Sequence, residues 1–451
     1  EGEVSLTPIQ LFFFDSHKQK RHHFNQHVLL NPVSKISYTE FKQVVEELVK
    51  HHDGLRTIFT DSDSGKPSQN ITEYKENIYT EYHDFSDAQK PFEEMKKNAS
   101  SLQEAFNLKG GPLFKAVYYK LKDEERLLFL AHHLIIDTVS WRFLMDDFDI
   151  MYKAISENKV RPRLYKTSSI IDWTDAINNY AMSETIDKEV AFWKRLEEKS
   201  FYQFDRITTS VKSDAISKQY NLSENDTIFL KDNIQKIAGV DVQTLLMNVF
   251  ATSFNHTVDA DNILIGLESH GRANCFDGVD VNKTVGWFTS FFPTVVETSK
   301  DISVKYLQKT KKDLTETPNY GIGYQILKYI SPEETKTKLT YNLVHEIVFN
   351  YLGEIQETSS SGNFELAGED VGENQAKEIR ESIPLEFSTY IIDNILYMSL
   401  NNDGSIPLTE FESLFQTFQV ELERAINFLK NEDMSNGRIT DHGLAEKKIQ
   451  E

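Results

Sequence analysis

The spacing of hydrophobic residues predicts an amphipathic helix early in the chain. After residue 40, apolar side chains recur every three or four positions and would form one face of a helix. They are Phe41, Val44, Val45, Leu48 and Val49. Ser37 and Glu40 stand in the order of a capping box, in which each side chain bonds the other residue's backbone N–H. We expect this helix to end at Gly54.

Short apolar runs separated by charged residues predict strands. Residues 55–59 form one run, and residues 113–121 and 127–132 form two more on either side of the charged segment 122–126. A charged turn between two apolar runs is typical of a β-hairpin. A further helix is expected near residues 101–107.

The second half repeats this order of elements. Helical patterns around residues 186–196 and 242–254 precede an apolar strand within 262–272, which ends in polar residues. The polar segment 156–169 is expected to connect the halves. Residues 356–377 are rich in Ser, Gly and Glu, which predicts a mobile surface loop. Two similar halves of mixed strands and helices predict an α/β protein with a cleft between two lobes.

Two adjacent histidines end the strand predicted at 127–132, in the segment AHHLIIDTVSW. Successive side chains of a strand point to opposite faces, so His132 and His133 cannot both face one cavity. We expect one histidine to do chemistry and the other to hold the turn. Ser140 is expected to cap the next helix. The apolar face of that helix would hold Trp141, Leu144, Phe148 and Met151.

Composition narrows the classes of partner. The 451 residues include 49 Lys and Arg against 70 Asp and Glu, a formal net charge of −21, and such a surface repels nucleic acid and anionic membranes. No stretch approaches the roughly 20 apolar residues that span a bilayer, and the N-terminus does not resemble a secretory signal. Cys275 is the single cysteine, which excludes a disulfide framework. We expect a cytoplasmic protein and, because the chain begins at Glu1, a monomeric domain excised from a longer one.

His133 and Glu268 are the two candidates for proton transfer. A neutral imidazole at the mouth of a cleft accepts a proton near pH 7, although a histidine after a buried strand is more often a core residue. Glu268 follows an apolar strand and would more often be solvated or paired with Arg272, but burial beside His133 would raise its pKa. Asp137 lies four residues after His133, yet the apolar residues between them favour a strand, so no metal is expected there.

Several segments resemble the motifs of one family. HHLIIDTVSW is similar to the HHxxxDGxSW signature of the condensation-domain superfamily of nonribosomal peptide synthetases. The same signature also marks related CoA-dependent acyltransferases. Other segments, in the family's order and across most of the chain, resemble the motifs of its epimerization branch. They are LTPIQ (6–10), HHFNQ (22–26), LESHGR (267–272), VGWFTS (285–290), NYGIGYQILKY (319–329) and FNYLG (349–353).

The resemblance implies a fold of two chloramphenicol-acetyltransferase-like lobes arranged in a V, with an active-site tunnel between them. The N-terminal lobe would comprise residues 1–170 and the C-terminal lobe residues 171–451. It also implies catalytic roles for His133 and Glu268. Asn350 and Tyr351 would line the site near the glutamate, although a purely structural turn is an equal expectation for these two residues.

Three further residues match positions with a structural role in the family. His132 and Asp137 belong to the histidine motif, and the resemblance implies that Asp137 pairs with Arg56. The tunnel wall would include Trp287, Phe288, Thr289 and Ser290. The chain departs from the family pattern at three positions, none of which removes a proton-transfer group. They are Thr138 in place of glycine, Ser269 in place of glycine and Phe13 in place of tryptophan.

The implied reaction inverts the α-carbon of an aminoacyl or peptidyl thioester carried on the phosphopantetheine arm of a peptidyl carrier domain. The domain itself would bind no cofactor, and its partners would be that carrier and neighbouring adenylation and condensation domains. Two other functions stay open. A condensation domain would use His133 to assist an attacking amine, whereas a recruitment domain without activity is disfavoured by the intact HHxxxD motif.

Overall fold

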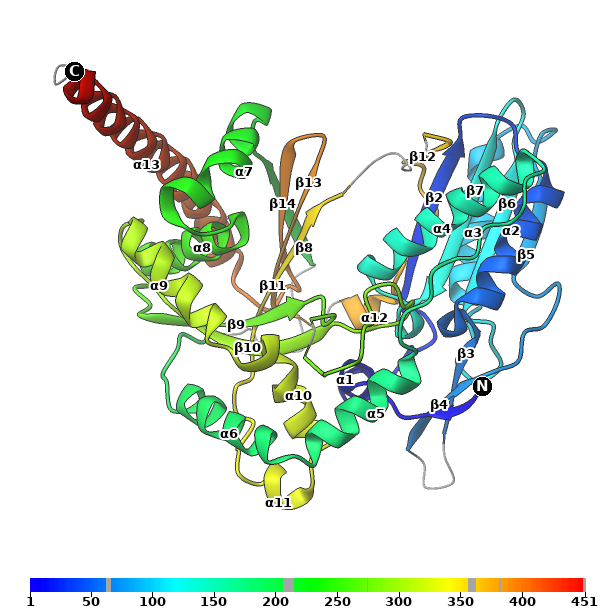
Figure 1. Ribbon diagram of the computed structural model, residues 1–451, viewed down its shortest axis with the longest axis horizontal. Coiled ribbons are helices and arrows are strands. Elements are labelled where there is room, and N and C mark those ends of the chain that lie inside the picture. Colours follow the sequence, from blue (N-terminus) through cyan, green and yellow to red (C-terminus); the bar gives the residue numbers. More distant parts are fainter. Residues whose placement is uncertain (62–65, 206–214, 274, 356–361, 381–382, 449–451) are drawn as a thin grey trace.

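Two large β-sheets, each with its own helices, lie on opposite sides of the molecule in the computed structural model (Figure 1). The structure describes residues 1–61, 66–205, 215–273, 275–355, 362–380 and 383–448. Each sheet contributes to a separate large hydrophobic core. This arrangement confirms the expected mixed α/β fold.

The first sheet has five strands in the order β12-β2-β7-β6-β5. They are β2 (Asn25–Pro32), β5 (Thr80–Asp84), β6 (Phe114–Lys120), β7 (Glu125–His132) and β12 (Phe364–Leu366). β6 and β7 form the predicted hairpin and pair antiparallel, with Lys120 opposite Glu125. β2 pairs antiparallel with the other side of β7, which places β7, and the histidines at its end, in the middle of the sheet.

The apolar spacing after residue 40 does form a helix, α2 (Tyr38–His51). Its five predicted apolar residues are buried, and Ser37 and Glu40 make both bonds of the capping box. α2 packs against β5 and β6. The helix ends three residues before Gly54, which lies in the short 3-10 helix η1 (Asp53–Arg56).

Two other helices of this half begin where the sequence did not predict. α4 (Thr138–Ser156) is capped by Asp137, not by Ser140, because the Asp137 carboxylate accepts the backbone N–H of Ser140 at 2.8 Å. The four residues predicted for its apolar face are buried. α3 (Pro91–Glu104) begins ten residues before the expected helix, with Pro91 in its first turn, a position that proline favours.

Part of the segment predicted as a mobile loop belongs to the first sheet. Residues 356–361 lie outside the described residues, but Phe364–Leu366 form β12 and pair antiparallel with β2. Phe364 is buried against Phe148 and Tyr152 of α4. The loop prediction is therefore wrong for β12, where one aromatic side chain anchors a polar segment. Residues from the second half of the chain complete the sheet of the first half.

The second sheet has six strands in the order β10-β9-β11-β13-β14-β8. They are β8 (Ile216–Asn221), β9 (Asn262–Ser269), β10 (Ser290–Glu297), β11 (Ile347–Glu354), β13 (Leu385–Ile392) and β14 (Ile395–Asn402). β11 runs parallel to both β9 and β13, and the remaining pairs are antiparallel. Because β9 and β11 are parallel, residues after their last paired positions, Leu267 and Phe349, meet at one edge of the sheet.

Most of the remaining helices belong to the second half of the chain. They are α5 (Ile170–Ala181), α6 (Glu184–Glu197), α7 (Glu224–Ala238), α8 (Val242–Val258), α9 (Val304–Thr315), α10 (Ile322–Tyr329), α11 (Glu333–Lys336), α12 (Lys377–Arg380) and α13 (Leu408–Lys448), with the 3-10 helix η3 (Pro318–Gly321). The helices predicted around residues 186–196 and 242–254 are α6 and α8. Ser156 of the predicted connection at 156–169 is the last residue of α4, and residues 157–169 lie between α4 and α5 and contain no helix or strand.

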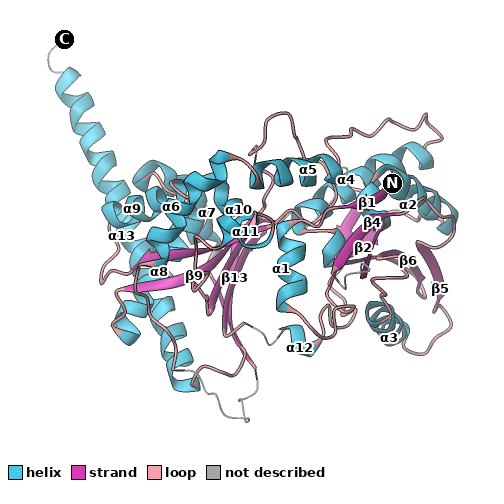
Figure 2. Cartoon of the chain, turned by 90° about the horizontal axis from the view of Figure 1, so that it is seen from below, coloured by secondary structure: helices cyan, strands magenta, loops and turns pink. Residues whose placement is uncertain are grey.

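One helix lies between the two large sheets. α1 (Pro8–Ser16) separates them in the view of Figure 2. Its Phe12 contacts Phe291 of β10, with ring centroids 5.2 Å apart, and its Phe13 stacks on Phe24 at 5.0 Å. A third, small sheet has the order β1-β4-β3. Its strands are β1 (Gly2–Val4), β3 (Thr57–Asp61) and β4 (Pro67–Ile71).

Within the described part of the chain, no single helix is long and apolar enough to cross a membrane. α7 and α8 meet those criteria only as a pair that is bent by 88°.

Candidate active site

A cavity of about 790 Å³ is lined by residues of both halves of the chain. Its volume falls within the range of roughly 300–1,000 Å³ that is usual for small-molecule sites. Four of the residues that the sequence singled out as catalytic line it, namely His133, Glu268, Asn350 and Tyr351. Gln26, Asp137, Thr138, Ser269 and Thr289 contribute to the same wall. The cavity therefore brings the ends of β7, β9 and β11 together.

The imidazole of His133 is held from several sides. Its ring stacks on Phe24, with centroids 5.0 Å apart and an interplanar angle of 9°, and Trp287 contacts it at 4.3 Å. Nε2 of His133 lies 2.9 Å from the amide nitrogen of Gln26. Burial lowers the pKa of His133 below 6.5, and the carboxylate of Asp137 opposes this shift only in part. The imidazole is therefore held neutral near pH 7, the state in which it accepts a proton.

His132 does not reach the cavity. It is fully buried; its Nε2 donates to the carbonyl of Arg21 at 2.7 Å, and its Nδ1 accepts the N–H of Leu134 at 3.2 Å. Burial lowers its pKa to about 3. One histidine thus faces the cavity and the other fixes the turn, but His133 begins the 3-10 helix η2 (His133–Ile135) and so does not continue the strand as expected.

Glu268 lies at the end of β9, directly opposite Phe291 of β10. Its side chain is open to the cavity, and no hydrogen bond to it occurs among the described residues. Desolvation by the surrounding protein raises the pKa of Glu268 to about 7, and the carboxylate of Glu386 on β13 adds to this effect. Removal from bulk water favours the neutral acid, so this carboxyl exchanges a proton near neutral pH.

Asn350 and Tyr351 follow Phe349, the last residue of β11 that pairs with β9, and they line the same cavity as Glu268. Asn350 lies on the same face of the sheet as Glu268, because each is one position beyond the pair Phe349 and Leu267. Burial raises the pKa of the Tyr351 hydroxyl, which therefore stays protonated and able to donate a hydrogen bond. The sheet register thus places the Asn350 amide on the same face as the Glu268 carboxyl, and Tyr351 lines the same cavity.

Asp137 is paired with Arg272, not with Arg56, so the predicted pairing is wrong. Nη1 of Arg272 lies 2.6 Å from Oδ2 of Asp137, and both side chains are buried. Nη2 of Arg272 donates to the hydroxyl of Ser140 at 2.7 Å, and the N–H of Phe288 donates to Asp137 at 3.1 Å. This network joins the start of α4 to the segment after β9.

Gly271 gives Arg272 access to Asp137. Its φ angle is +65°, in the left-handed region that favours glycine. A Cβ at this position would lie 1.7 Å from the carbonyl oxygen of Phe288, so only glycine allows this approach. Arg272 pairs with Asp137, and the described residues show no ion pair between Arg272 and Glu268, the alternative that the sequence had left open.

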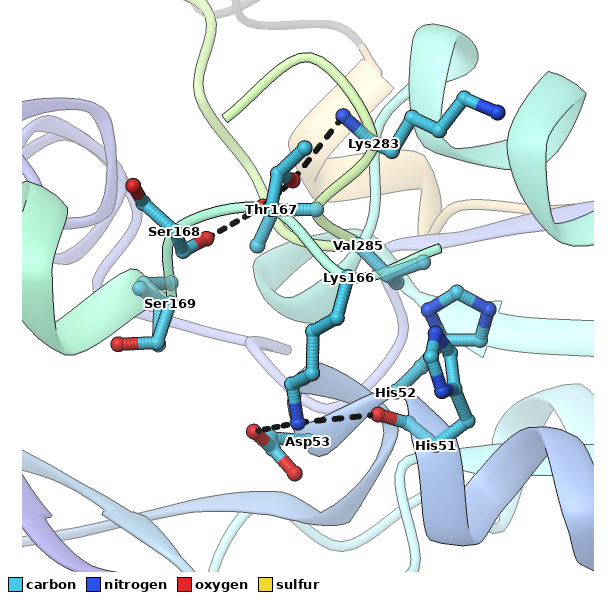
Figure 3. Close-up of a pocket in the computed structure, with 12 residues that line it drawn as sticks. His51, His52, Asp53, Lys166, Thr167, Ser168, Ser169, Lys283 and Val285 are labelled. Carbon is cyan, nitrogen blue, oxygen red and sulfur yellow. Dashed lines mark hydrogen bonds and ion pairs between the residues drawn. The ribbon is translucent and has the colours of Figure 1, made fainter. Parts of the chain in front are cut away.

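Arg56 instead closes the end of α2. It donates to the carbonyls of Val49 at 2.6 Å and Lys50 at 3.1 Å, and it pairs with Asp53 at 2.8 Å. Asp53 also binds Lys166 at 2.9 Å in a small pocket away from the large cavity (Figure 3). An arginine beside the last carbonyls of a helix stabilises its negative end. Its role is therefore structural, but in a different place.

The segment predicted to line a tunnel divides between cavity and interior. Thr289 lines the cavity, and Trp287 lies against the His133 ring. Phe288 is buried under the guanidinium of Arg272 at 4.5 Å, and Ser290 is buried and donates to the carbonyl of Tyr320. The structure thus places Phe288 and Ser290 in the interior, because the segment meets the arginine network there.

Among the residues that the structure describes, one group of side chains could hold a metal ion. Ligand atoms of His51, His52 and Asp147 lie within 4.8 Å of one another. His52 and Asp147 already share a contact of 3.0 Å, and the ammonium of Lys166 lies beside the His51 carbonyl. This cluster does not line the large cavity. The sequence interpretation had considered only His133 and Asp137 as ligands and did not identify it.

The pattern of motifs did not single out Gln26 as a site residue. It lies on β2 opposite Ala131, and only the fold brings it to His133. Its segment, HHFNQ, resembled a family motif, and that resemblance was the one available signal.

Comparisons with known proteins place the chain in a family. A family model described as condensation domain matches residues 1–426. Bacitracin synthase 3 of Bacillus licheniformis is 30% identical over 395 residues, which are 87% of this chain and 6% of that protein. Gramicidin S synthase 1 of Brevibacillus brevis is 30% identical over 408 residues, 88% of this chain and 36% of that protein. The chain therefore spans only a small part of these curated relatives.

Solved structures share the fold. The epimerization domain from the third module of tyrocidine synthetase B superposes with a TM-score of 0.87 and 27% identity, over 96% of this chain and 98% of that one. The starter condensation domain of rhizomide synthetase gives a TM-score of 0.70 at 14% identity, over 94% and 98% of the two chains, which shows a common fold alone. On the match to residues 1–426, this chain belongs to the condensation-domain family of nonribosomal peptide synthetases.

Proposed function

We propose that this domain inverts the α-carbon of an aminoacyl or peptidyl thioester, delivered on the phosphopantetheine arm of a peptidyl carrier domain. The observation that carries the proposal is the presence of two proton-transfer groups, His133 and Glu268, in the wall of one cavity. Inversion needs two such groups, because the proton leaves one face of the carbon and another returns to the opposite face.

The chemistry follows from the acidity of the α-carbon of a thioester. One group accepts the α-proton as the C–H bond breaks, and the electron pair moves onto the carbonyl oxygen to give an enolate. The second group then donates its own proton to the opposite face, and the electron pair returns to form the new C–H bond. No electrons are gained or lost, so the reaction requires no oxidant or reductant.

The order of the two pKa values favours one starting state. The pKa of His133 is below 6.5 and that of Glu268 is about 7, so a single proton shared by the pair resides on Glu268. Neutral His133 is then the base and protonated Glu268 the acid. In the reverse direction, the two groups exchange these roles.

The enolate oxygen needs a hydrogen-bond donor or a positive charge. Asn350 and Tyr351 both line the cavity, and both carry donors. We assign the stabilisation of this oxygen to these two side chains, because the pKa of the Tyr351 hydroxyl is raised and its proton therefore stays in place.

The comparisons support the same choice. The epimerization domain of tyrocidine synthetase B has a TM-score of 0.87, against 0.68 to 0.71 for the condensation-domain structures of rhizomide synthetase and the calcium-dependent antibiotic synthetase. The curated relatives are synthases much longer than this chain. The proposed partners are accordingly a carrier domain and the adenylation and condensation domains of such a synthase.

A condensation domain is the second candidate, favoured by the family model itself. In that function His133 would assist an amine that attacks an upstream thioester, and Glu268 would have no proton to move.

Isotope exchange distinguishes the two functions. The protein is incubated in deuterated water with a carrier domain that bears an L-aminoacyl phosphopantetheine, and the released amino acid is analysed by mass and on a chiral column. Incorporation of one deuterium at the α-carbon together with the D-isomer is the expected result. Peptide formation with a second aminoacyl carrier, without deuterium in either residue, would refute epimerization and favour condensation.

A further inference from the structure

The contacts of Gln26 assign it a role that the family motifs do not name. We propose that Gln26 is a positioning residue that holds His133 in the neutral tautomer with the proton on Nδ1 and the lone pair on Nε2. Only the role assigned to that lone pair, which is to accept the substrate proton, rests on the proposed function.

The orientation of the Gln26 amide is set by Trp141. The indole Nε1–H of Trp141 lies 2.9 Å from Oε1 of Gln26, and an indole nitrogen can only donate a hydrogen bond. Trp141 is buried in the first turn of α4. The amide oxygen of Gln26 must therefore face Trp141, because the reverse orientation would place two N–H groups against each other.

The other end of the amide then determines the state of His133. The NH₂ group of Gln26 lies 2.9 Å from Nε2 of His133, and an amide nitrogen also can only donate. Nε2 must accept this bond and cannot carry a hydrogen. A neutral imidazole has one proton, which consequently resides on Nδ1.

The His133 ring has no freedom to exchange its two nitrogens. Phe24 and Trp287 contact it at 5.0 and 4.3 Å. Nδ1 of His133 is buried and has no hydrogen-bond partner among the described residues, so the contact between Nε2 and Gln26 alone fixes the tautomer.

The neighbouring histidine shows that this tautomer is specific to His133. Nε2 of His132 faces the carbonyl of Arg21, and its Nδ1 faces the N–H of Leu134, so His132 carries its proton on Nε2. Two adjacent histidines are thus held in opposite tautomers by different partners.

The arrangement also opposes protonation of His133 in the empty cavity. An imidazolium would direct Nε2–H at the NH₂ group of Gln26, whereas the carboxylate of Asp137 favours the charge. His132 adds a second imidazole close by. A substrate that displaces the Gln26 amide exposes the Nε2 lone pair, which then accepts the α-proton.

Gln26→Glu tests the proposal, because it keeps the shape of the side chain and replaces the donor with an acceptor. Its carboxylate still accepts the indole N–H of Trp141, but it now favours a proton on Nε2 of His133. The readout is nitrogen NMR of protein with ¹⁵N-labelled histidine, in which the His133 signals are identified by their loss in a His133→Gln variant. We expect a proton on Nδ1 in the wild type and on Nε2 in Gln26→Glu, with the pKa of His133 raised by about 1–3 units. Gln235→Glu, an exposed position on α7, is the matched control and should leave these signals unchanged.

Trp141→Phe provides a second variant that retains an aromatic side chain. It removes the indole N–H that orients Gln26, so the His133 signals should move from those of one tautomer towards an average of two. A wild-type His133 with its proton on Nε2, or unchanged His133 signals in both variants, would overturn the proposal.

The NMR readout needs no substrate, so it separates this proposal from the proposed function. A wild type with the expected tautomer but without L-to-D inversion would refute the function and leave the role of Gln26 intact. In an active enzyme, the limb of the pH–rate profile that reports His133 should move to higher pH in Gln26→Glu. A purely structural contribution of Gln26 would lower the rate without moving this limb.

Discussion

Arg272 and Asp137, which lie 135 positions apart in the sequence, form a buried ion pair with 2.6 Å between Nη1 and Oδ2. Asp137 also caps α4, and Arg272 follows β9, so the pair fixes the histidine segment of one half against the glutamate segment of the other. The cavity depends on this junction, because His133 and Glu268 each lie four residues before one member of the pair.

We predict that removal of either partner destabilises the fold. Asp137→Ala and Arg272→Ala each leave a buried charge without its counter-ion, a change that commonly costs about 3–5 kcal/mol. The double variant should cost less than the sum of the two, with a coupling of about 0.5–3 kcal/mol in urea unfolding. Arg56→Ala is the control, since Arg56 bonds the end of α2, and its effect should add to that of Asp137→Ala. Coupling between Arg56 and Asp137, rather than Arg272 and Asp137, would contradict the pairing seen here.

The wrong prediction that Arg56 pairs with Asp137 shows what local sequence patterns cannot predict. Arg56 lies in the predicted strand 55–59 and Arg272 at the end of the segment 262–272, and local spacing does not indicate which of them lies near Asp137. The choice depends on the turn at Gly271, where the backbone comes too close to Phe288 for any side chain. Such a contact between distant segments leaves no periodic signal in the sequence.

The pKa of Glu268 gives the second prediction, which concerns stability. Its pKa is raised from 4.5 to about 7 in the folded protein, so between these pH values the folded state binds more protons than the unfolded state. Stability therefore decreases as the pH rises from about 4.5 to 7. Glu268→Gln removes this effect, so its melting temperature relative to the wild type should increase between pH 5 and pH 8.

The exposed Glu198 at the C-terminal end of α6 offers a matched control. Glu198→Gln should show no such trend in melting temperature. A constant difference between Glu268→Gln and the wild type across this range would mean that the carboxyl titrates at its ordinary pH.

A third prediction follows from Glu386, whose carboxylate adds to the raised pKa of Glu268. Glu386 accepts hydrogen bonds from Ser388 at 3.2 Å and Asn401 at 3.3 Å on the open face of the sheet. Glu386→Gln removes the like charge, so the pKa of Glu268 should fall while desolvation by the surrounding cavity wall keeps it above 4.5. The pH–rate profile should shift to lower pH on the limb that reports Glu268. An unchanged profile would show that desolvation alone sets this pKa.

Local patterns did predict the residues at the ends of strands. Glu268 and the histidine pair each follow an apolar run, and His133 lies just beyond β7, at the start of a short 3-10 helix whose N-cap is His132. The partners of these residues were not predictable in this way, because Gln26 reaches His133 across a sheet and is oriented by Trp141 on a helix. β12 was missed because Phe364 is a single buried aromatic residue in a polar segment, and its strand forms only against β2.

The last prediction separates the two proton-transfer groups. Glu268→Gln keeps the shape and hydrogen-bonding capacity of the side chain but cannot exchange a proton at useful pH. We expect L-to-D inversion to fall by about 10²-fold or more, which is a typical contribution of general acid–base catalysis. Exchange of the α-hydrogen from one stereoisomer should persist, because His133 still serves one face of the carbon. His133→Ala should show the complementary loss, with exchange retained only from the other stereoisomer, while the melting temperature of each variant reports whether the fold is intact. Chiral analysis of the hydrolysed thioester, carried out beside deuterium exchange, measures both quantities. Inversion by Glu268→Gln at near the wild-type rate would exclude a mechanism with one proton-transfer group on each face.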